Sequence, residues 1–215
     1  MGRYVVAVTG ASGATYARRL VAALCAAGHT VDLMVSAAGI AVLAHELDWE
    51  DPIYDGAGGM EGRCRRFFLA GGATCDPSGL RFHSIHDVFG PLASGSVPID
   101  GMIVVPCTMG RVAAIAGGRS ADLLERCADV TLKEGRPLVV VPRETPLSLI
   151  HLRNLTALCE AGAVVLPAMP GFYHHPRDLD AVADFVVAKV FARLGLPDLA
   201  RTLLAPWPGS RAPKG

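Results

Sequence analysis

The residues of this 215-residue chain that could do chemistry stand where its apolar segments end. They are small hydroxyls, one arginine–carboxylate pair and one phenol. In chain order they lie at 9–13, Ser36, 107–111, Arg143 with Glu144, and 171–173. Open parallel sheets bind ligands at the carboxyl ends of their strands, so this distribution predicts one rim of residues around one ligand.

Arg143 and Glu144 directly follow the apolar run 137–142. At a sheet edge the guanidinium could bind a phosphate through two parallel hydrogen bonds, while the neighbouring carboxylate relays a proton. The pair could instead cap a helix that begins near Pro146, because acidic residues favour first turns. Tyr173 has two interpretations as well, as a partner for a phosphate or hydroxyl or as a half-buried core residue.

Other candidate groups are less specific. Arg126 and Lys133 lie seven residues apart in a predicted helix, so they share a face and could both reach an anion. Solvated surface charges are the more usual explanation of such a pair. His174 and His175 are adjacent and cannot easily point inward together, so no metal site is predicted.

The elements that position these residues begin with a predicted strand, glycine turn, helix and strand. Residues 4–8 form a continuous apolar run of the kind found in buried parallel strands, and 14–27 are strong helix formers without proline. The turn 9–13 separates them, and 30–35 returns as a second strand. Such a unit directs free N–H groups of a helix N-terminus at the mouth of the sheet, which predicts a phosphorylated ligand. A tight turn without a ligand is the simpler alternative.

The turn does not match three well-known motifs. A Walker loop needs a lysine after its second glycine, and none follows Gly13. A dinucleotide fingerprint needs G-x-G-x-x-G and an acid after the second strand, but that strand ends in Ser36. A nucleophile elbow needs a residue between serine and glycine, whereas Ser12 directly precedes Gly13.

Strands and helices alternate along the rest of the chain, which predicts an α/β fold with a mainly parallel sheet. The least regular part is 51–84, predicted as a hairpin or long loop. We expect one domain at 1–196 and an arm at 197–215. Further strands are predicted at 101–106, 137–142 and 163–167, and further helices at 36–47, 112–116, 121–133, 147–161 and 179–194.

Composition limits the classes of function. Apolar residues make up 51% of the chain and the mean hydropathy is +0.37, which indicates extensive burial between subunits. No apolar run reaches the ~18–20 residues of a membrane span, and no signal-like segment is present. Lys+Arg and Asp+Glu are 20 each, so nucleic acid is not expected as a partner. Six cysteines without C-x-x-C spacing indicate reduced thiols in a cytoplasmic protein.

Several blocks of the sequence, in unbroken order to about Leu196, are similar to the UbiX-type flavin prenyltransferases. The most specific part of the similarity extends from Leu132-Lys-Glu to Arg143-Glu-Thr-Pro. The blocks are TGASG at 9–13, PCT at 106–108, RCADVTLKE at 126–134, RPLV at 136–139, PRETP at 142–146, HL at 151–152 and PGFYH at 170–174.

The resemblance implies a Rossmann-like, flavodoxin-type three-layer sandwich and a homo-oligomer built from trimers, typically a dodecamer. It implies binding of FMN and of dimethylallyl phosphate, without metal. The dimethylallyl group would be joined to N5 and C6 of the flavin, and the prenylated FMN would serve a UbiD-type decarboxylase. No membrane association follows from it.

The resemblance also implies roles for individual residues. Ser12 and Glu144 would manage protons, and Glu46 would lie close by as a third catalytic residue. The FMN would be held by Gly10, Ala11, Ser12, Ser36, Thr108, Met109, Gly110, Arg111 and Arg126. The dimethylallyl phosphate would be bound by Ser94, Lys133, Arg143, Tyr173 and Lys189.

The chain departs from the family pattern at several positions. Lys189 stands where arginine is usual, which keeps the charge and loses the bidentate fork. Arg111 replaces a threonine near the flavin, and Thr108 replaces a serine. Val88 stands where some members have a tryptophan, and Trp207 could supply another pocket aromatic.

Two other functions fit parts of the pattern. An FMN-dependent cysteine-type decarboxylase would share the fold and the cofactor, but the loop 106–110 lacks the expected Asn, as does 168–170. A non-catalytic carrier of prenylated FMN is the second alternative.

Overall fold

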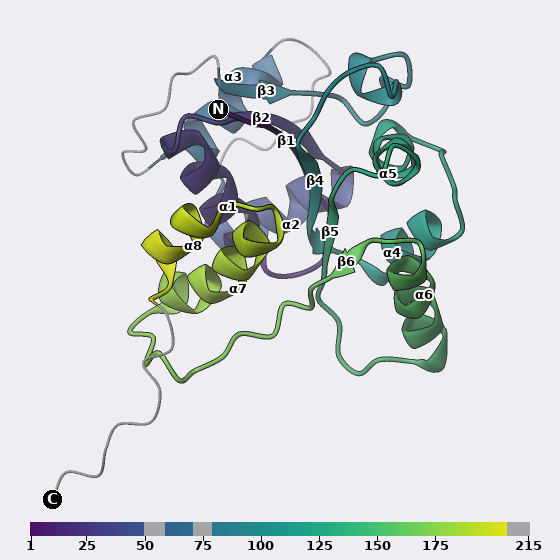
Figure 1. Cartoon of the computed structure of the whole chain (residues 1–215). Helices are drawn as coiled ribbons and strands as arrows, with labels where there is room; N and C mark the ends of the chain where they lie inside the picture. Colours follow the sequence, from purple (N-terminus) through teal and green to yellow (C-terminus); the bar gives the residue numbers. More distant parts are fainter. Residues whose placement is uncertain (50–58, 71–78, 206–215) are drawn as a thin grey trace, which may run out of the picture.

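The computed structural model describes residues 1–49, 59–70 and 79–205. Six strands in these residues form one sheet in the order β3-β2-β1-β4-β5-β6, and every neighbouring pair is parallel. This is the doubly wound order, in which the direction of winding reverses between β1 and β4. The predicted α/β class and parallel sheet are confirmed (Figure 1).

The elements follow the predicted order closely for most of the chain. The strands are β1 (Arg3–Val8), β2 (Thr30–Val35), β3 (Leu80–Phe82), β4 (Gly101–Cys107), β5 (Leu138–Pro142) and β6 (Val164–Val165). The helices are α1 (Ala14–Ala26), α2 (Ala37–Leu47), α3 (Gly59–Phe68), the 3₁₀ turn η2 (Pro91–Ala93), α4 (Met109–Ala116), α5 (Leu123–Lys133), α6 (Leu149–Glu160), α7 (Leu179–Arg193) and α8 (Pro197–Leu203).

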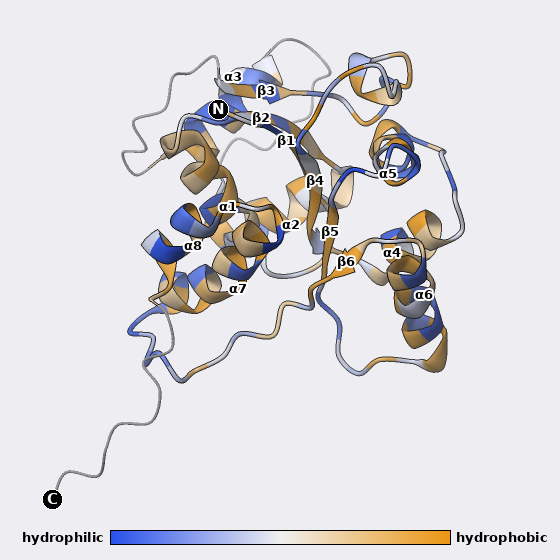
Figure 2. Cartoon of the chain, in the orientation of Figure 1, coloured by the Kyte–Doolittle hydropathy of each residue, from blue (hydrophilic) through white to orange (hydrophobic). Residues whose placement is uncertain are grey.

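Helices cover both faces of the sheet, which gives the predicted three layers. Alternate residues of a strand point to opposite faces. In β5, Val139 and Val141 pack toward α1, α2, α3 and α7, whereas Leu138 and Val140 pack toward α4, α5 and α6. The central strands are hydrophobic along their length and the outer helix faces carry hydrophilic residues (Figure 2).

The prediction for 51–84 was wrong in its described part. Residues 59–68 form α3, which buries Met60, Cys64 and Phe68 at helical spacing. β3 pairs with β2 in parallel, so it cannot belong to a hairpin with that strand. Residues 50–58 and 71–78 lie outside the described part of the chain.

The prediction of an arm from residue 197 also needs correction. The first seven of these residues form α8, which begins with Pro197 at a position where proline suits a helix. Helix α8 packs beside α7 (Figure 1). Residues 206–215, including Trp207, lie outside the described part of the chain.

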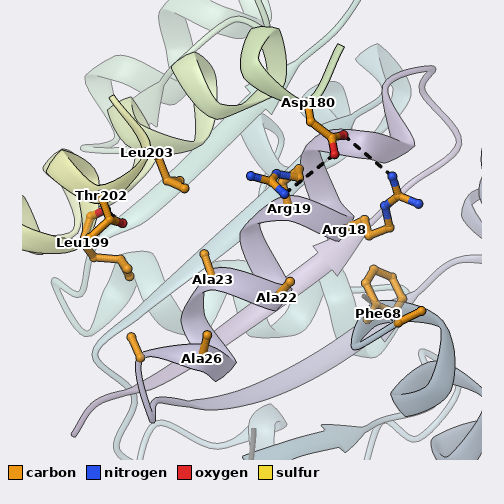
Figure 3. Close-up of a pocket in the computed structure, with 12 residues that line it drawn as sticks. Arg18, Arg19, Ala22, Ala23, Ala26, Phe68, Asp180, Leu199, Thr202 and Leu203 are labelled. Carbon is orange, nitrogen blue, oxygen red and sulfur yellow. Dashed lines mark hydrogen bonds and ion pairs between the residues drawn. The ribbon is translucent and has the colours of Figure 1, made fainter. Parts of the chain in front are cut away.

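Ion pairs fasten α1, near the start of the chain, to α7, near its end. Arg19 donates to both carboxylate oxygens of Asp184, at 2.8 and 2.6 Å, and Arg18 lies 3.8 Å from Asp180. A groove of about 770 Å³ runs beside these pairs, between α1, the end of α3 and α8 (Figure 3). None of the predicted site residues lines it, so it is separate from the site described next.

Candidate active site

The strand ends at the reversal point of the sheet are joined through Thr9. Its hydroxyl donates to the carbonyl of Pro106 (2.8 Å) and accepts from the N–H of Thr108 (2.9 Å). Thr9 is 1% exposed, and its bond to Pro106 is fully buried. The two bonds hold the turn after β1 against the turn after β4 at the edge where the strands end, which we call the carboxyl edge.

The start of α2 joins the same edge. Ser36 caps this helix by accepting from the N–H of Gly39 at 3.0 Å. The turn after β1 lies directly against it, because a Cβ added to Gly10 would stand 2.5 Å from the Cβ of Ala38. Only glycine fits there, which explains the first glycine of the turn. Gly10, Ser36 and Thr108, all predicted to bind FMN, are thus grouped around one point.

Three predicted residues form a cluster at this edge. The carboxylate of Glu46, near the end of α2, accepts from the N–H groups of Gly13 (2.9 Å) and Ala14 (2.8 Å). The Ser12 hydroxyl hydrogen-bonds to the same carboxylate. Arg143, just beyond β5, donates from Nε to the carbonyl of Ser12 at 3.1 Å. The cluster therefore links α1, α2 and β5.

The charge of Glu46 is fixed by these contacts. Partial burial alone would raise its pKa, but hydrogen bonds from Ser12, Ala14 and Gly13, with the positive charge of Arg143, hold the pKa below its ordinary value. The prediction that the N-terminus of α1 offers free N–H groups to a phosphate is wrong for Gly13 and Ala14, because both already bind this carboxylate. A phosphate at the same point would be repelled by it.

Two other helix starts at the carboxyl edge are better placed for an anion. In the described part of the chain, no protein acceptor is recorded for the N–H groups of Ala37 and Ala38 in α2 or of Met109 and Gly110 in α4. Helix N-termini bind phosphate through such groups. With the close packing at Gly10, this arrangement fits a flavin phosphate between the first turns of α2 and α4.

Two arginines predicted to bind FMN have protein partners instead. Arg111 lies in the first turn of α4, and its guanidinium contacts Glu125 (2.5 Å) and Asp122 (2.6 Å). Arg126 of α5 donates to the carbonyl of Ala93 and to Asp129. Neither side chain contacts the Ser12–Glu46–Arg143 cluster in the described structure.

Glu144 and Cys107 also stand at strand ends of the carboxyl edge. Glu144 is exposed, and its carboxylate accepts from the N–H of Thr145 at 3.1 Å. Burial raises the pKa of the Cys107 thiol to about 12, with only partial opposition from Arg111 and a backbone hydrogen bond. The thiol is therefore protonated at neutral pH, and we assign it no nucleophilic role.

Tyr173 and Lys189, both predicted to bind the prenyl donor, line one hollow of about 230 Å³. The ring of Phe185 contacts both of these residues. It makes an edge contact with the Tyr173 ring, with centroids 5.6 Å apart, and the ammonium of Lys189 lies 5.4 Å from its centroid. Gly171 permits this packing, since a Cβ there would stand 3.0 Å from the Phe185 ring.

Ser94 and Lys133 lie at the opposite edge of the sheet, where strands begin. Lys133 ends α5 shortly before β5 starts, and Ser94 precedes β4. The seven residues of β4 span about 23 Å, so this amino edge is far from Ser12 in the same chain. Both side chains are exposed, and within residues 1–49, 59–70 and 79–205 they bond only to near neighbours: Ser94 to Ser96 at 2.8 Å and Lys133 to Glu134 at 2.5 Å.

Sequence reasoning missed two residues of the site, Tyr16 and Phe185. Thr9 was predicted as part of the rim at 9–13, but not as the residue that joins the two turns. Tyr16 packs beside Gly13, and burial raises its pKa while nearby Arg143 opposes that shift. Phe185 gave no signal, because an aromatic residue in an amphipathic helix is usually core.

The described residues hold no group of three or more His, Cys, Asp or Glu that could bind a metal ion. Within the same residues, no helix is long and apolar enough to cross a bilayer.

Both the sequence and the fold of the chain are similar to those of known proteins. The sequence matches the family described as Flavoprotein over residues 2–191. It is 46% identical over 192 residues to a Synechocystis protein named Flavin prenyltransferase UbiX, covering 89% of this chain and 90% of that protein.

Two solved structures have the same fold. The crystal structure of AnUbiX (PadA1) in complex with FMN and dimethylallyl pyrophosphate matches with a TM-score of 0.82 and 36% identity, over 98% of this chain and 99% of that one. A dodecameric FMN-dependent UbiX-like decarboxylase from Escherichia coli O157:H7 matches with a TM-score of 0.75 and 37% identity, over 90% and 95%.

Proposed function

The chain belongs to the Flavoprotein family, among its UbiX-type flavin prenyltransferases, and we propose that it joins the dimethylallyl group of dimethylallyl phosphate to N5 and C6 of reduced FMN. The observation that carries the proposal is the Ser12–Glu46–Arg143 cluster. It places a hydroxyl, a carboxylate and a guanidinium beside the helix starts that fit a flavin phosphate.

The FMN site is proposed at the reversal point of the sheet. The first turns of α2 and α4 supply N–H groups for the phosphate, and Ser36 and Thr108 cap those turns. Gly10 lets the turn after β1 lie against the start of α2, and Gly10 and Ala11 would border the flavin along that turn. Reduced FMN supplies the nucleophilic ring atoms, and the protein holds and orients them.

The donor site is proposed from cations and aromatic rings. Arg143 and Lys189 would stabilise the negative charge that develops on the phosphate as its bond to the allyl group breaks. Tyr173 would donate a hydrogen bond to the same phosphate. Phe185 offers a π-face beside Lys189, and a positively charged allyl group is attracted to such a face.

Proton handling is proposed for Ser12 and Glu144. The Ser12 hydroxyl is oriented by the ionised Glu46, so its oxygen lone pairs remain open to a donor on the ligand. The exposed Glu144 carboxylate follows Arg143 and could accept the proton released from C6. Glu46 itself is engaged by three donors, which suits an orienting residue.

The amino-edge residues would complete the site from another copy of the chain. Ser94 and Lys133 cannot reach Arg143 within one chain, yet the resemblance assigns all three to the donor. A homo-oligomer built from trimers, assembled as a dodecamer, resolves this separation. Burial between copies would also keep water away from the reactive allyl group.

A single FMN-binding domain would span 1–196, with α8 packed against its last helix, and the protein would act in the cytoplasm. Its product, prenylated FMN, would be passed to a UbiD-type decarboxylase. The absence of Asn from the loop 106–110 argues against a cysteine-type decarboxylase, and the proton-handling residues argue against a carrier without activity.

The test is anaerobic incubation of the protein with reduced FMN and dimethylallyl phosphate, followed by mass spectrometry of the extracted flavin. A gain of one five-carbon unit is expected. Arg143→Ala should abolish the gain, and Arg153→Ala, which removes an exposed arginine of α6, should not. Bound but unmodified FMN in the unaltered protein would refute prenyl transfer and favour the carrier or decarboxylase function.

A further inference from the structure

Glu125 of α5 is a fully buried carboxylate with an unusual number of donors. Its side chain is 0% exposed. Arg119 donates to it from Nε (2.9 Å) and Nη2 (2.6 Å), Arg111 donates from Nη1 (2.5 Å), and the N–H of Ala121 donates at 2.9 Å. Burial alone would raise the pKa of Glu125, but these partners together lower it. Glu125 is therefore ionised and fully paired.

Arg111 connects this carboxylate to the start of α4. Its backbone N–H donates to the Thr108 cap at 3.3 Å, and its guanidinium reaches both Glu125 and Asp122. Asp122 in turn caps α5 by accepting from the N–H of Glu125 at 3.0 Å. One arginine thus ties the first turn of α4 to the first turn of α5.

The electrostatics explain why the arginine is paired in this way. A cation in the first turn of a helix opposes the helix dipole and is unfavourable there. Asp122 and Glu125 offset that cost, and with Arg111 and Arg119 they form a group of zero net charge. The side chain of Arg111 is 19% exposed and its guanidinium is engaged at two nitrogens, so it is not presented to a ligand.

We propose that Arg111 is a positioning residue for FMN: by pairing with Glu125 and Asp122 it fixes the first turn of α4, whose N–H groups receive the flavin phosphate, and it does not bind the flavin itself. The inference rests on the proposed function, which places FMN at that turn. It replaces the role of flavin ligand that the sequence resemblance implied for Arg111, a position where relatives were expected to have threonine.

The test compares the dissociation constant of FMN among full-length variants, measured by quenching of flavin fluorescence well below every melting temperature. Arg111→Met and Glu125→Gln are each expected to weaken FMN binding about tenfold. The double variant should be weakened about tenfold as well, because both changes remove one shared interaction. At saturating FMN the KM of dimethylallyl phosphate should be unchanged, because the loss is confined to FMN affinity.

A direct flavin contact predicts a different pattern. Releasing Arg111 by Glu125→Gln would then leave FMN binding unchanged or make it tighter, and this result would overturn the proposal. So would a hundredfold loss in the double variant, because independent effects add.

Arg119→Met is the matched control. It removes two hydrogen bonds from the same Glu125, but Arg119 lies after α4 has ended. The FMN affinity of the Arg119→Met variant should stay within about twofold of the affinity of the unaltered protein. A loss equal to that of Arg111→Met would show that the whole network, and not the first turn of α4, governs binding, and would refute the proposal.

Asp122→Asn keeps the test decisive if Glu125→Gln does not fold. Asparagine caps a helix as well as aspartate does, so α5 is preserved while the charge facing Arg111 is lost. FMN binding should weaken in this variant too, and unchanged binding would contradict the proposal. If the unaltered protein binds no FMN, the proposed function fails; if it binds FMN and all variants bind equally, only this inference fails.

Discussion

The carboxyl edge and the amino edge of the sheet hold their polar residues in different ways. At the carboxyl edge, Ser12, Glu46 and Arg143 come from three separate elements and fix one another through hydrogen bonds. At the amino edge, Ser94 and Lys133 are exposed, and their bonds in the described part of the chain go only to residues one or two positions away. The first group is complete within one chain, whereas the second is held in place only locally.

This difference shows which part of the site the single chain preorganises. Long-range contacts at the carboxyl edge fix the geometry before any ligand arrives, which is how a protein holds a cofactor in a defined orientation. The amino-edge side chains keep their rotamer freedom until something covers them. We therefore predict that one chain by itself forms the FMN-binding half of the site. The donor-binding half is completed only when copies of the chain assemble.

The strongest test of that contrast is complementation between copies. Arg143→Ala and Lys133→Ala should each reduce prenyl transfer by about two to three orders of magnitude, because each removes a cation that faces developing negative charge. When the two variants are dissociated, mixed and reassembled, activity should return, since some sites then combine an intact carboxyl edge with an intact amino edge. Activity is measured as prenylated FMN formed per minute.

A matched control keeps both changes in one chain. The double variant reassembled alone should recover nothing. Failure of the two single variants to complement, although mixed oligomers form, would contradict the division of the site between copies.

Glu144→Gln tests a residue of the carboxyl edge that lacks long-range contacts. Its exposed carboxylate bonds only to the neighbouring Thr145. We expect FMN to bind with unchanged affinity while product formation slows by about a hundredfold, because a general base is lost. Single-turnover kinetics measure the slowing, and full activity would exclude proton transfer by Glu144.

Glu46→Gln tests the fixed cluster through stability. The variant should lower the free energy of unfolding by about 1 kcal/mol at neutral pH, because the N–H groups at the start of α1 lose a charged acceptor. Folding lowers the pKa of Glu46 below 4.5. The stabilisation that the Glu46 carboxylate gives the folded state is thus complete above pH 4.5. It is lost as the pH falls through the lower pKa of Glu46 in the folded state.

Denaturant melts over a range of acid pH check this sign. The stabilities of the unaltered protein and of Glu46→Gln should converge as the pH falls. If the difference in stability between the two proteins stayed constant with pH, the charge of the carboxylate would not contribute to stability.

Phe185→Leu should have the smallest effect. The ring attracts the Lys189 ammonium from 5.4 Å, and such a contact contributes about 0.5–1 kcal/mol at an exposed site. The KM for dimethylallyl phosphate should rise about two- to fivefold, with FMN affinity unchanged. Phe191→Leu, in the core end of the same helix, should lower the melting temperature without changing this KM; equal KM effects would refute the assignment.

The sequence predicted the fold where local signals suffice. The β1–α1–β2 unit follows from an apolar run, a glycine turn and a proline-free helical segment, each readable within a few residues. Helix α3 was missed because its many Gly and Arg residues have low mean hydropathy, and the burial of Met60, Cys64 and Phe68 that stabilises it depends on tertiary packing. Helix α8 was missed because a proline at 197 favours an irregular arm, although proline is also common at the first helical position.

The site was predicted as a rim, but not as a set of contacts. Strand ends and sequence resemblance located Ser12, Ser36 and Arg143 correctly at the carboxyl edge. The capping of α1 by Glu46 joins residues 33 positions apart, and no local pattern reports such a bond. The pairing of Arg111 with Glu125 is non-local in the same way, since it depends on how α4 and α5 pack.

The bidentate pair between Arg19 and Asp184 joins residues 165 positions apart. While the chain emerges from the ribosome, the face of α1 that α7 later covers has no partner until nearly the whole sequence has been made. Contacts of such long separation slow folding, because the intervening chain must be ordered before they form. A nascent chain truncated before α7 would therefore expose an apolar helix face, and chaperone binding to that face should end only when Asp184 has left the exit tunnel.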